Sequence, residues 1–261
     1  MKKKDLFMKE SGRETRPVVM LFHVLMMAVV IAGVFWLSLA MLDITFDFSF
    51  LGQLKSRIGR GFLITVGISV CSFLLSLIIG MVSVVGQRSR LLFVRYCCVF
   101  YVTFMRGTPL IMQIYLFYYI IGTAWGIENR YVAGVLILSL FEGAYIAEII
   151  RGSLLTLDES QLEAARAVGF TRRQRVVYVI LPQVIVGALP ALTGQFASII
   201  KDSSLLSMIA VIELTQTMKE ISSANYRLFE CYLILGALYL VMTLPVTFVS
   251  KKLEKRFDYA N

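Results

Sequence analysis

The sequence has little of what catalysis and metal binding require. It contains one histidine, His23, and four cysteines, none in a Cys-x-x-Cys pair and all within apolar segments. With no acidic or histidine partner placed nearby, the cysteines are expected to pack rather than to bind metal. We expect His23 to be an interfacial or packed histidine, with a proton relay as the alternative. The sequence also lacks a Gly-x-x-x-x-Gly-Lys-Ser/Thr phosphate loop and any Ser/His/Asp arrangement. We therefore predict that the chain is not an enzyme and holds no metal and no cofactor of its own.

Charged residues are scarce as well. They make up 16% of the chain, against roughly 25% in an average soluble domain, while 58% of the residues are hydrophobic. Six long runs each reach the length of about 20 residues that a membrane-spanning helix needs. These runs are 17–42, 61–86, 107–127, 131–150, 176–200 and 231–250. Because lipid leaves no partner for unpaired backbone groups, runs this long predict an all-α, polytopic membrane protein with six helical spans.

The net charge of +9 is distributed across the membrane rather than gathered in a nucleic-acid-binding stripe. With six spans, both termini lie on one side, and that side holds 18 basic residues against seven on the other. The positive-inside rule then places both termini and the loop around residue 163 in the cytoplasm. The basic start followed by an apolar run also resembles a signal peptide, but the run is too long and acids interrupt the tail, so we expect a retained helix.

The loop at 158–182 carries two helix-start patterns. Ser160 to Glu163 and Thr171 to Gln174 both have the Ser/Thr-x-x-Glu/Gln form of a capping box. Gly169 lies between them and suits a left-handed helix stop, so we expect a helix over 162–168, a turn at 169–170 and a second helix running into Pro182. The alanines of the first helix leave it nearly bare. A bare helix is typical of one that docks into a partner's groove.

Ionisable groups within the spans are few, and each is a functional candidate because burial in lipid costs several kcal/mol. Arg106 precedes Gly107-Thr108-Pro109, where a helix over about 96–119 is expected to break; pathway lining and a structural pairing with a carboxylate both remain open. Glu142 is the better pathway candidate, whereas Glu148 can pair with Arg151 three residues later. The remaining candidates, in and at the end of the following span, are Gln195, Lys201 and Asp202. For Lys201 and Asp202 an interfacial salt bridge is the alternative interpretation.

Five ordered motifs resemble those of importer-type ABC transporter permeases, specifically the polar amino-acid branch. The loop reads Glu-Ala-Ala-x-x-x-Gly from Glu163, then nine residues, then Val-Ile-Leu-Pro to Pro182. Val179 stands where the family has Ile, and Ser160 where the branch usually has Gly. The other motifs begin at Phe104, Ala144, Leu181 and Lys201, and the resemblance covers roughly 61–256.

The resemblance implies a type I ABC importer transmembrane domain, with a five-helix core plus one extra N-terminal helix. It divides the chain into 1–60 (basic tail, extra helix and external linker), 61–256 (permease domain with coupling loop 158–182) and 257–261 (tail). It implies a polar amino-acid importer in the cytoplasmic membrane, with two ATP-binding subunits that hold ATP and Mg, a second permease subunit and an extracytoplasmic solute-binding protein. The residues expected to couple to the ATPase are Gln161, Glu163, Ala164, Ala165, Gly169 and Phe170. The residues expected to line the pathway or contact substrate are Arg106, Glu142, Gln195, Lys201 and Asp202.

Two other classes remain open from the residues. A secondary transporter or channel also explains intramembrane charges but not the two-helix loop. A membrane-bound enzyme would gather its reacting groups near one interface, whereas here they are dispersed. The sequence does not distinguish a basic, acidic or amide amino acid as the substrate, nor a homodimer from a pair of related permeases.

Overall fold

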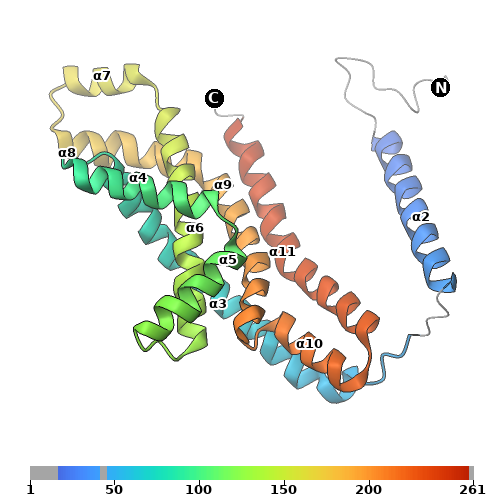
Figure 1. Ribbon diagram of the computed structural model, residues 1–261. Coiled ribbons are helices and arrows are strands. Elements are labelled where there is room, and N and C mark those ends of the chain that lie inside the picture. The colour runs from blue at the N-terminus through green and yellow to red at the C-terminus, as the bar shows by residue number, and fades with distance from the viewer. Residues whose placement is uncertain (1–16, 42–45, 259–261) are drawn as a thin grey trace. The chain divides into compact units, whose positions relative to one another are not determined.

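Helices form almost all of the computed structural model, which describes residues 17–41 and 46–258 (Figure 1). No strand occurs within those two ranges. Contacts divide the chain into two units, 1–47 and 48–261, each of which is described by itself. The helical class predicted from the apolar runs is confirmed.

Among the described residues of the first unit, the helix is α2 (Pro17–Met41), which has 25 residues and no charged side chain. Its polar side chains hydrogen-bond within the helix: His23 Nδ1 lies 2.8 Å from the Val19 carbonyl, and Ser38 donates to the Val34 carbonyl at 2.8 Å. Side chains that bond to their own backbone are tolerated in lipid. The helix is long and apolar enough to cross a membrane.

The second unit contains the remaining helices. In chain order they are α3 (Leu51–Gln87), α4 (Leu92–Gly107), α5 (Leu110–Tyr115), η1 (Leu116–Gly122), α6 (Arg130–Leu155), α7 (Glu159–Ala167), α8 (Arg172–Arg175), η2 (Val176–Ile180), α9 (Leu181–Asp202), η3 (Ser203–Ile209), α10 (Leu214–Asn225) and α11 (Leu228–Asp258). Over the described parts of the chain, α2 included, five helices can cross a membrane, and a bent pair makes a sixth span if it counts as one. The working count of six spans holds only with that pair included.

The bent pair corrects the span predicted at 107–127. The helix starts at Leu92, ends at Gly107 and resumes at Leu110, with a bend of 114° between the two parts. Thr108 and Pro109 adopt extended backbone, as expected where proline lacks an N–H and disfavours a helical residue before it. The predicted break is confirmed, but the segment is two helices at a steep angle.

Proline does not break the long segment that follows the loop. From Arg172 to Asp202 the chain is helical without a gap, through α8, η2 and α9, although it contains Pro182 and Pro190. The five π-helical residues of η2 lie just before Pro182. A widened turn accommodates the ring and the missing donor, so the helix continues.

Small residues line the seam between α3 and α6. Four buried serines and a glycine recur three or four positions apart on one face of α3, and they are Ser69, Ser72, Ser76, Gly80 and Ser83. Ser139 of α6 donates to the Ser72 carbonyl at 3.3 Å. Helices in lipid associate through close packing of this kind, because burying apolar surface there brings no hydrophobic gain. This seam fixes α6, which carries Glu142.

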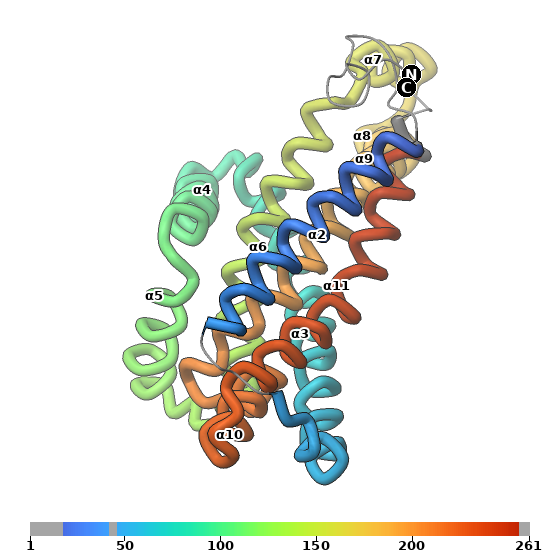
Figure 2. Tube along the Cα trace, turned by 90° about the vertical axis from the view of Figure 1, so that its right-hand side faces the viewer, coloured from blue at the N-terminus to red at the C-terminus, as the bar shows by residue number. Residues whose placement is uncertain are grey.

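The loop helix α7 and the short helix α10 lie at opposite ends of the second unit. In both views α7 and the C-terminal end of α11 are at one end, whereas α10 and the start of α3 are at the other (Figures 1 and 2). The unit therefore has one end formed by the predicted coupling loop and a second end formed by α10.

Candidate translocation site and coupling loop

Three of the predicted pathway residues meet at the α6–α9 contact. Glu142 is fully buried, and its Oε2 accepts a hydrogen bond from Gln195 Nε2 at 2.5 Å. Asp202 is the last residue of α9, and its carboxyl group interacts electrostatically with that of Glu142. No described residue forms a standard hydrogen bond with Glu142 Oε1. A buried carboxyl oxygen without a donor is costly, so this site favours a ligand that brings N–H groups.

Arg106 and Lys201 do not join this cluster. Arg106 Nη1 lies 3.1 Å from Glu148 Oε2, and Arg151 holds the same carboxylate at 2.7 Å. The Arg106 guanidinium also lies 5.5 Å from the ring centre of Tyr145. Glu148 is thus neutralised by two arginines beside the α4–α5 break, which favours the structural alternative for Arg106. Lys201 is exposed and makes no ion pair with any residue that the structure describes.

The described residues contain no group of three His, Cys, Asp or Glu side chains arranged for a metal ion. Two carboxyl groups and one amide bind an ammonium and a polar side chain well.

The first loop helix is capped by a residue that the sequence analysis passed over. Asp158, not Ser160, is the N-cap of α7, and its side chain accepts from the Ser160 N–H at 2.9 Å. This backbone hydrogen bond lowers the pKa of Asp158 below its ordinary value. An N-cap residue must precede the first helical residue. Asp158 does so, whereas Ser160 lies inside α7. The predicted capping box at Thr171 and Gln174 is confirmed.

Gly169 ends α7 in the predicted left-handed conformation, with φ +86°. The Gly169 N–H donates to the Arg166 carbonyl at 2.9 Å and the Phe170 N–H to the Ala165 carbonyl at 3.0 Å. These two bonds form a Schellman motif, which reverses the chain toward α8. No atom lies within 4 Å of a Cβ built on Gly169, so backbone conformation and not space requires glycine here.

Most of the predicted coupling residues are exposed on α7. Gln161, Glu163, Ala164 and Phe170 are exposed, whereas Ala165 is buried at 8% exposure and supports the helix from inside. Gln161 Oε1 accepts from Gln183 Nε2 at 2.8 Å, and the same nitrogen donates to the Val179 carbonyl at 2.9 Å. This contact joins the loop helix directly to α9.

A second buried carboxylate was missed. Glu213 is fully buried at the N-terminus of α10, where it accepts from the N–H groups of Thr215 and Gln216 at 2.8 Å and from the Tyr239 hydroxyl at 3.2 Å. Burial raises the pKa of Glu213 above its ordinary value, and the hydrogen bonds oppose that shift. The pattern Glu213-x-x-Gln216 before a polar helix was the only signal in the sequence.

Comparison with known families settles the class of protein. Residues 72–259 match the family described as "binding-protein-dependent transport system inner membrane component". The chain belongs to this family. It is a multi-pass inner-membrane permease subunit of an ATP-driven ABC importer, and ATP hydrolysis takes place in a separate subunit. The expectation that the chain is not an enzyme is thereby confirmed.

The permease subunit is similar to several curated proteins along most of its length. It is 32% identical to the glutamine transport system permease protein GlnP of Escherichia coli (strain K12), over 81% of this chain and 97% of that protein. It is 32% identical to the probable glutamine ABC transporter permease protein GlnM of Bacillus subtilis (strain 168), over 76% and 92%. It is 31% identical to the L-cystine transport system permease protein TcyB of the same organism, over 76% and 85%.

Solved structures show the same fold. A chain of a crystal structure titled as an amino acid ABC transporter with histidines matches at TM-score 0.75 and 32% identity, covering 82% of this chain and all of that one. A chain of the MetNI methionine ABC transporter in an inward-facing conformation matches at TM-score 0.60 with 17% identity, covering 80% and 99%. The second likeness concerns the fold alone. The predicted type I importer transmembrane fold is confirmed.

Proposed function

We propose that this permease subunit translocates polar amino acids into the cell. The observation that carries the proposal is the buried cluster of Glu142, Gln195 and Asp202, which brings two carboxyl groups and one amide together. An amino acid brings an ammonium that the carboxyl groups can bind. A glutamine-like side chain also brings an amide, and Gln195 can form the hydrogen bonds that water makes to this amide in solution. The similar proteins named as glutamine and cystine permeases support the same substrate class.

The exposed face of α7 docks into the ATP-binding subunit. Val168, at the end of the helix, is 77% exposed, and Phe170 two residues later is 36% exposed. An exposed apolar side chain on a short polar element is typical of a protein contact. The contact residues are Gln161, Glu163, Ala164, Gly169 and Phe170, with Ala165 positioning the helix. Two such subunits supply ATP and Mg, a second permease chain completes the pathway, and a solute-binding protein delivers the amino acid.

The loop and the termini face the cytoplasm. The bias of basic residues supports this orientation. The position of α7 at the same end of the unit as the C-terminal end of α11 is consistent with it, since both then lie on the side of the ATPase.

Motion of the ATP-binding subunits reaches the substrate site through one continuous element. Gln161 of α7 is hydrogen-bonded to Gln183 of α9, and the same unbroken helix carries Gln195 and Asp202 to Glu142. Movement of the loop therefore moves two of the three site residues. The loop then has two positions, one for each accessibility of the substrate site. If the ATPase dimer binds these two positions with different affinity, its own ligand changes which side of the membrane the site faces.

The test is a reconstituted complex in proteoliposomes, containing this permease, its ATP-binding subunits and its binding protein. We expect one or more of L-glutamine, L-glutamate, L-arginine and L-cystine to stimulate ATP hydrolysis and to accumulate inside. A complex without the binding protein is the control. If no polar amino acid raises the rate of ATP hydrolysis or accumulates inside the liposomes, the proposed substrate class is wrong.

A further inference from the structure

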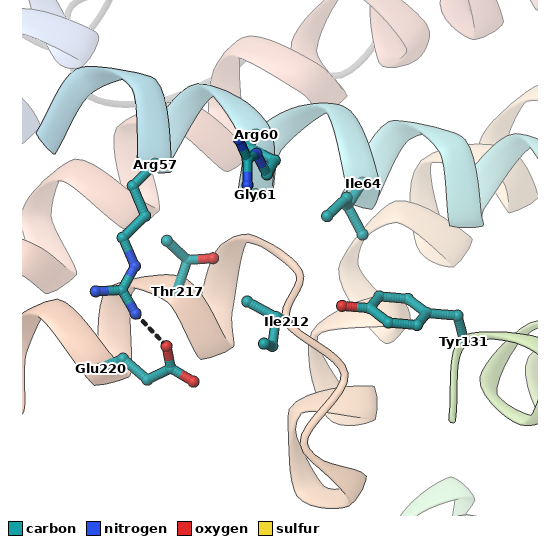
Figure 3. Close-up of a pocket in the computed structure, with 8 residues that line it drawn as sticks. All are labelled: Arg57, Arg60, Gly61, Ile64, Tyr131, Ile212, Thr217 and Glu220. Carbon is teal, nitrogen blue, oxygen red and sulfur yellow. Dashed lines mark hydrogen bonds and ion pairs between the residues drawn. The ribbon is translucent and has the colours of Figure 1, made fainter. Parts of the chain in front are cut away.

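A cavity lined by charged and apolar side chains lies at the end of the permease opposite α7. It has a volume of about 270 Å³ and lies between the start of α3, the start of α6 and α10 (Figure 3). Small-molecule pockets generally span about 300–1,000 Å³, so this cavity suits a ligand no larger than an amino acid. Its lining consists of Arg57, Arg60, Gly61, Ile64, Tyr131, Ile212, Thr217 and Glu220.

The cavity presents charges of both signs. Arg57 of α3 forms an ion pair with Glu220 of α10 across one side (Figure 3). Glu220 also accepts a hydrogen bond from Gln216 Nε2 at 3.1 Å. The guanidinium of Arg60, one helical turn along from Arg57, has no ion pair or hydrogen bond to any residue described by the structure. The site therefore offers one uncommitted cation beside an acidic group.

Two hydroxyl groups of the lining are also uncommitted. Thr217 is 1% exposed, and its Oγ1 has no hydrogen-bond partner in the part of the chain that the structure describes. A Cβ at Gly61 would lie 2.7 Å from that oxygen, so glycine at this position is what leaves the hydroxyl uncovered. The Tyr131 hydroxyl points into the space between Ile64 and Ile212 (Figure 3). A buried hydroxyl without a partner costs about 1–3 kcal/mol, which a bound polar ligand removes.

We propose that this cavity is an outer subsite for the zwitterionic head of the amino acid. Arg60 binds the carboxylate and Thr217 donates to it, while Glu220 receives the ammonium. A zwitterion fits better than a phosphate, because the Glu220 carboxylate repels a doubly charged anion, and better than a simple cation, because the two arginines repel it. The inference rests on the proposed function, since it assumes that an amino acid is carried.

The subsite is separate from the Glu142 cluster. Tyr131 and Glu142 are on the same helix, and the rise of about 1.5 Å per residue puts them about 16 Å apart along its axis. A solute released at this end would be held at Arg60 first and at Glu142 second. The two sites then bind the same head group in turn.

The experiment uses Ile212→Cys in the reconstituted complex, because Ile212 lines the cavity and is 41% exposed. A water-soluble, charged thiol reagent is added from the outside, and the rate of labelling is measured with and without the amino acid that the complex imports. At about ten times its dissociation constant the amino acid is expected to slow labelling about tenfold, since only the empty site reacts. The unsubstituted chain gives the background from its four native cysteines.

Chemical and mutational arms identify the ligand. The N-acetyl and α-amide derivatives, each lacking one charge, are expected not to protect. Arg60→Gln is expected to remove protection without changing the labelling rate in the absence of ligand, and Lys55→Gln, on the same helix outside the cavity, to retain it. Protection by glycerophosphate instead of the amino acid would reveal an anion or lipid-headgroup site and overturn the proposal.

The outcomes separate the two proposals. Import of an amino acid with no protection, or with protection that survives Arg60→Gln, overturns the outer subsite alone. A complex that imports none of the four amino acids overturns the proposed function.

Discussion

At the scale of the residue, the two glutamates of α6 show how the environment sets the role of a carboxylate. Glu148 lies against two arginines, whereas Glu142, six residues earlier, lies against the Gln195 amide and the Asp202 carboxyl. Six residues on a helix turn the direction by roughly 120°, so the two side chains face different neighbours. The sequence ranked Glu142 first as a pathway residue, and its surroundings support that ranking.

Replacing Glu142 by glutamine is expected to slow amino-acid uptake in proteoliposomes at least about tenfold, since a hydrogen bond to a charged group contributes about 1.5–3 kcal/mol and 1.4 kcal/mol is tenfold. Glutamine keeps the shape and can still bond to Gln195. Thr193→Val is the matched control on α9, because the Thr193 hydroxyl donates only to the Leu189 carbonyl. Uptake by Glu142→Gln equal to that by the control would show that this carboxylate does not contact substrate.

Glu213 predicts a pH dependence of stability. Because burial raises its pKa in the folded state, the folded chain binds this proton more tightly than the unfolded chain does. The stabilising contribution is present below the ordinary value near 4.5 and is lost as the pH rises through the raised pKa. The melting temperature of the purified permease should therefore fall over that range, and Glu213→Gln should remove part of the fall. Identical pH profiles for both proteins would contradict the assignment.

At the scale of the element, the sequence predicted which segments are helical better than it predicted how they meet. Gly107-Thr108-Pro109 indicated a break, but the 114° bend depends on packing that no local pattern contains. The N-cap at Asp158 was missed because Ser160 offered a complete pattern two residues later. The serine and glycine stripe of α3 has a readable spacing and could have predicted the α6 seam.

Gly80 tests that seam. A Cβ at this position would lie 2.6 Å from Ile146 Cγ2 and 3.1 Å from the Ala147 nitrogen, so the backbone itself would have to move. Gly80→Val is expected to destabilise the fold by about 1–3 kcal/mol, as overpacking generally does. A Cβ at Gly67, on the same helix, would meet no described atom outside its own helix turn within 4 Å, so Gly67→Val serves as the control. Equal thermal stability of the two variants would exclude tight packing at the seam.

Gly169 tests the end of the loop helix. Its φ of +86° is strained for valine, so Gly169→Val is expected to displace the reversal between α7 and α8. We expect membrane insertion to be retained and amino-acid-stimulated ATP hydrolysis to fall at least about tenfold if the docking contact costs 1.4 kcal/mol or more. Gly152→Ala, in a regular part of α6 with open space around it, is the control. Normal stimulation in Gly169→Val would mean that the turn does not serve coupling.

At the scale of the whole molecule, α7 lies at one end of the second unit and the cavity beside α10 lies at the other. The apolar runs and the Glu-Ala-Ala pattern predicted the membrane fold and the loop, because both depend on local composition and spacing. The cluster of Glu142 with Gln195 and the buried Glu213 depend on contacts between distant segments. Only the three-dimensional structure brings those groups together.

The central claim is that α7 contacts a separate ATP-binding subunit. The most direct measurement is cysteine cross-linking in the assembled complex with Val168→Cys, since this side chain is 77% exposed beside the reversal. Tyr226→Cys, 94% exposed at the opposite end next to α10, is the control. We predict a cross-link between residue 168 and the ATP-binding subunit, and none from residue 226. A cross-link from residue 226 alone, or from neither position, would contradict the account.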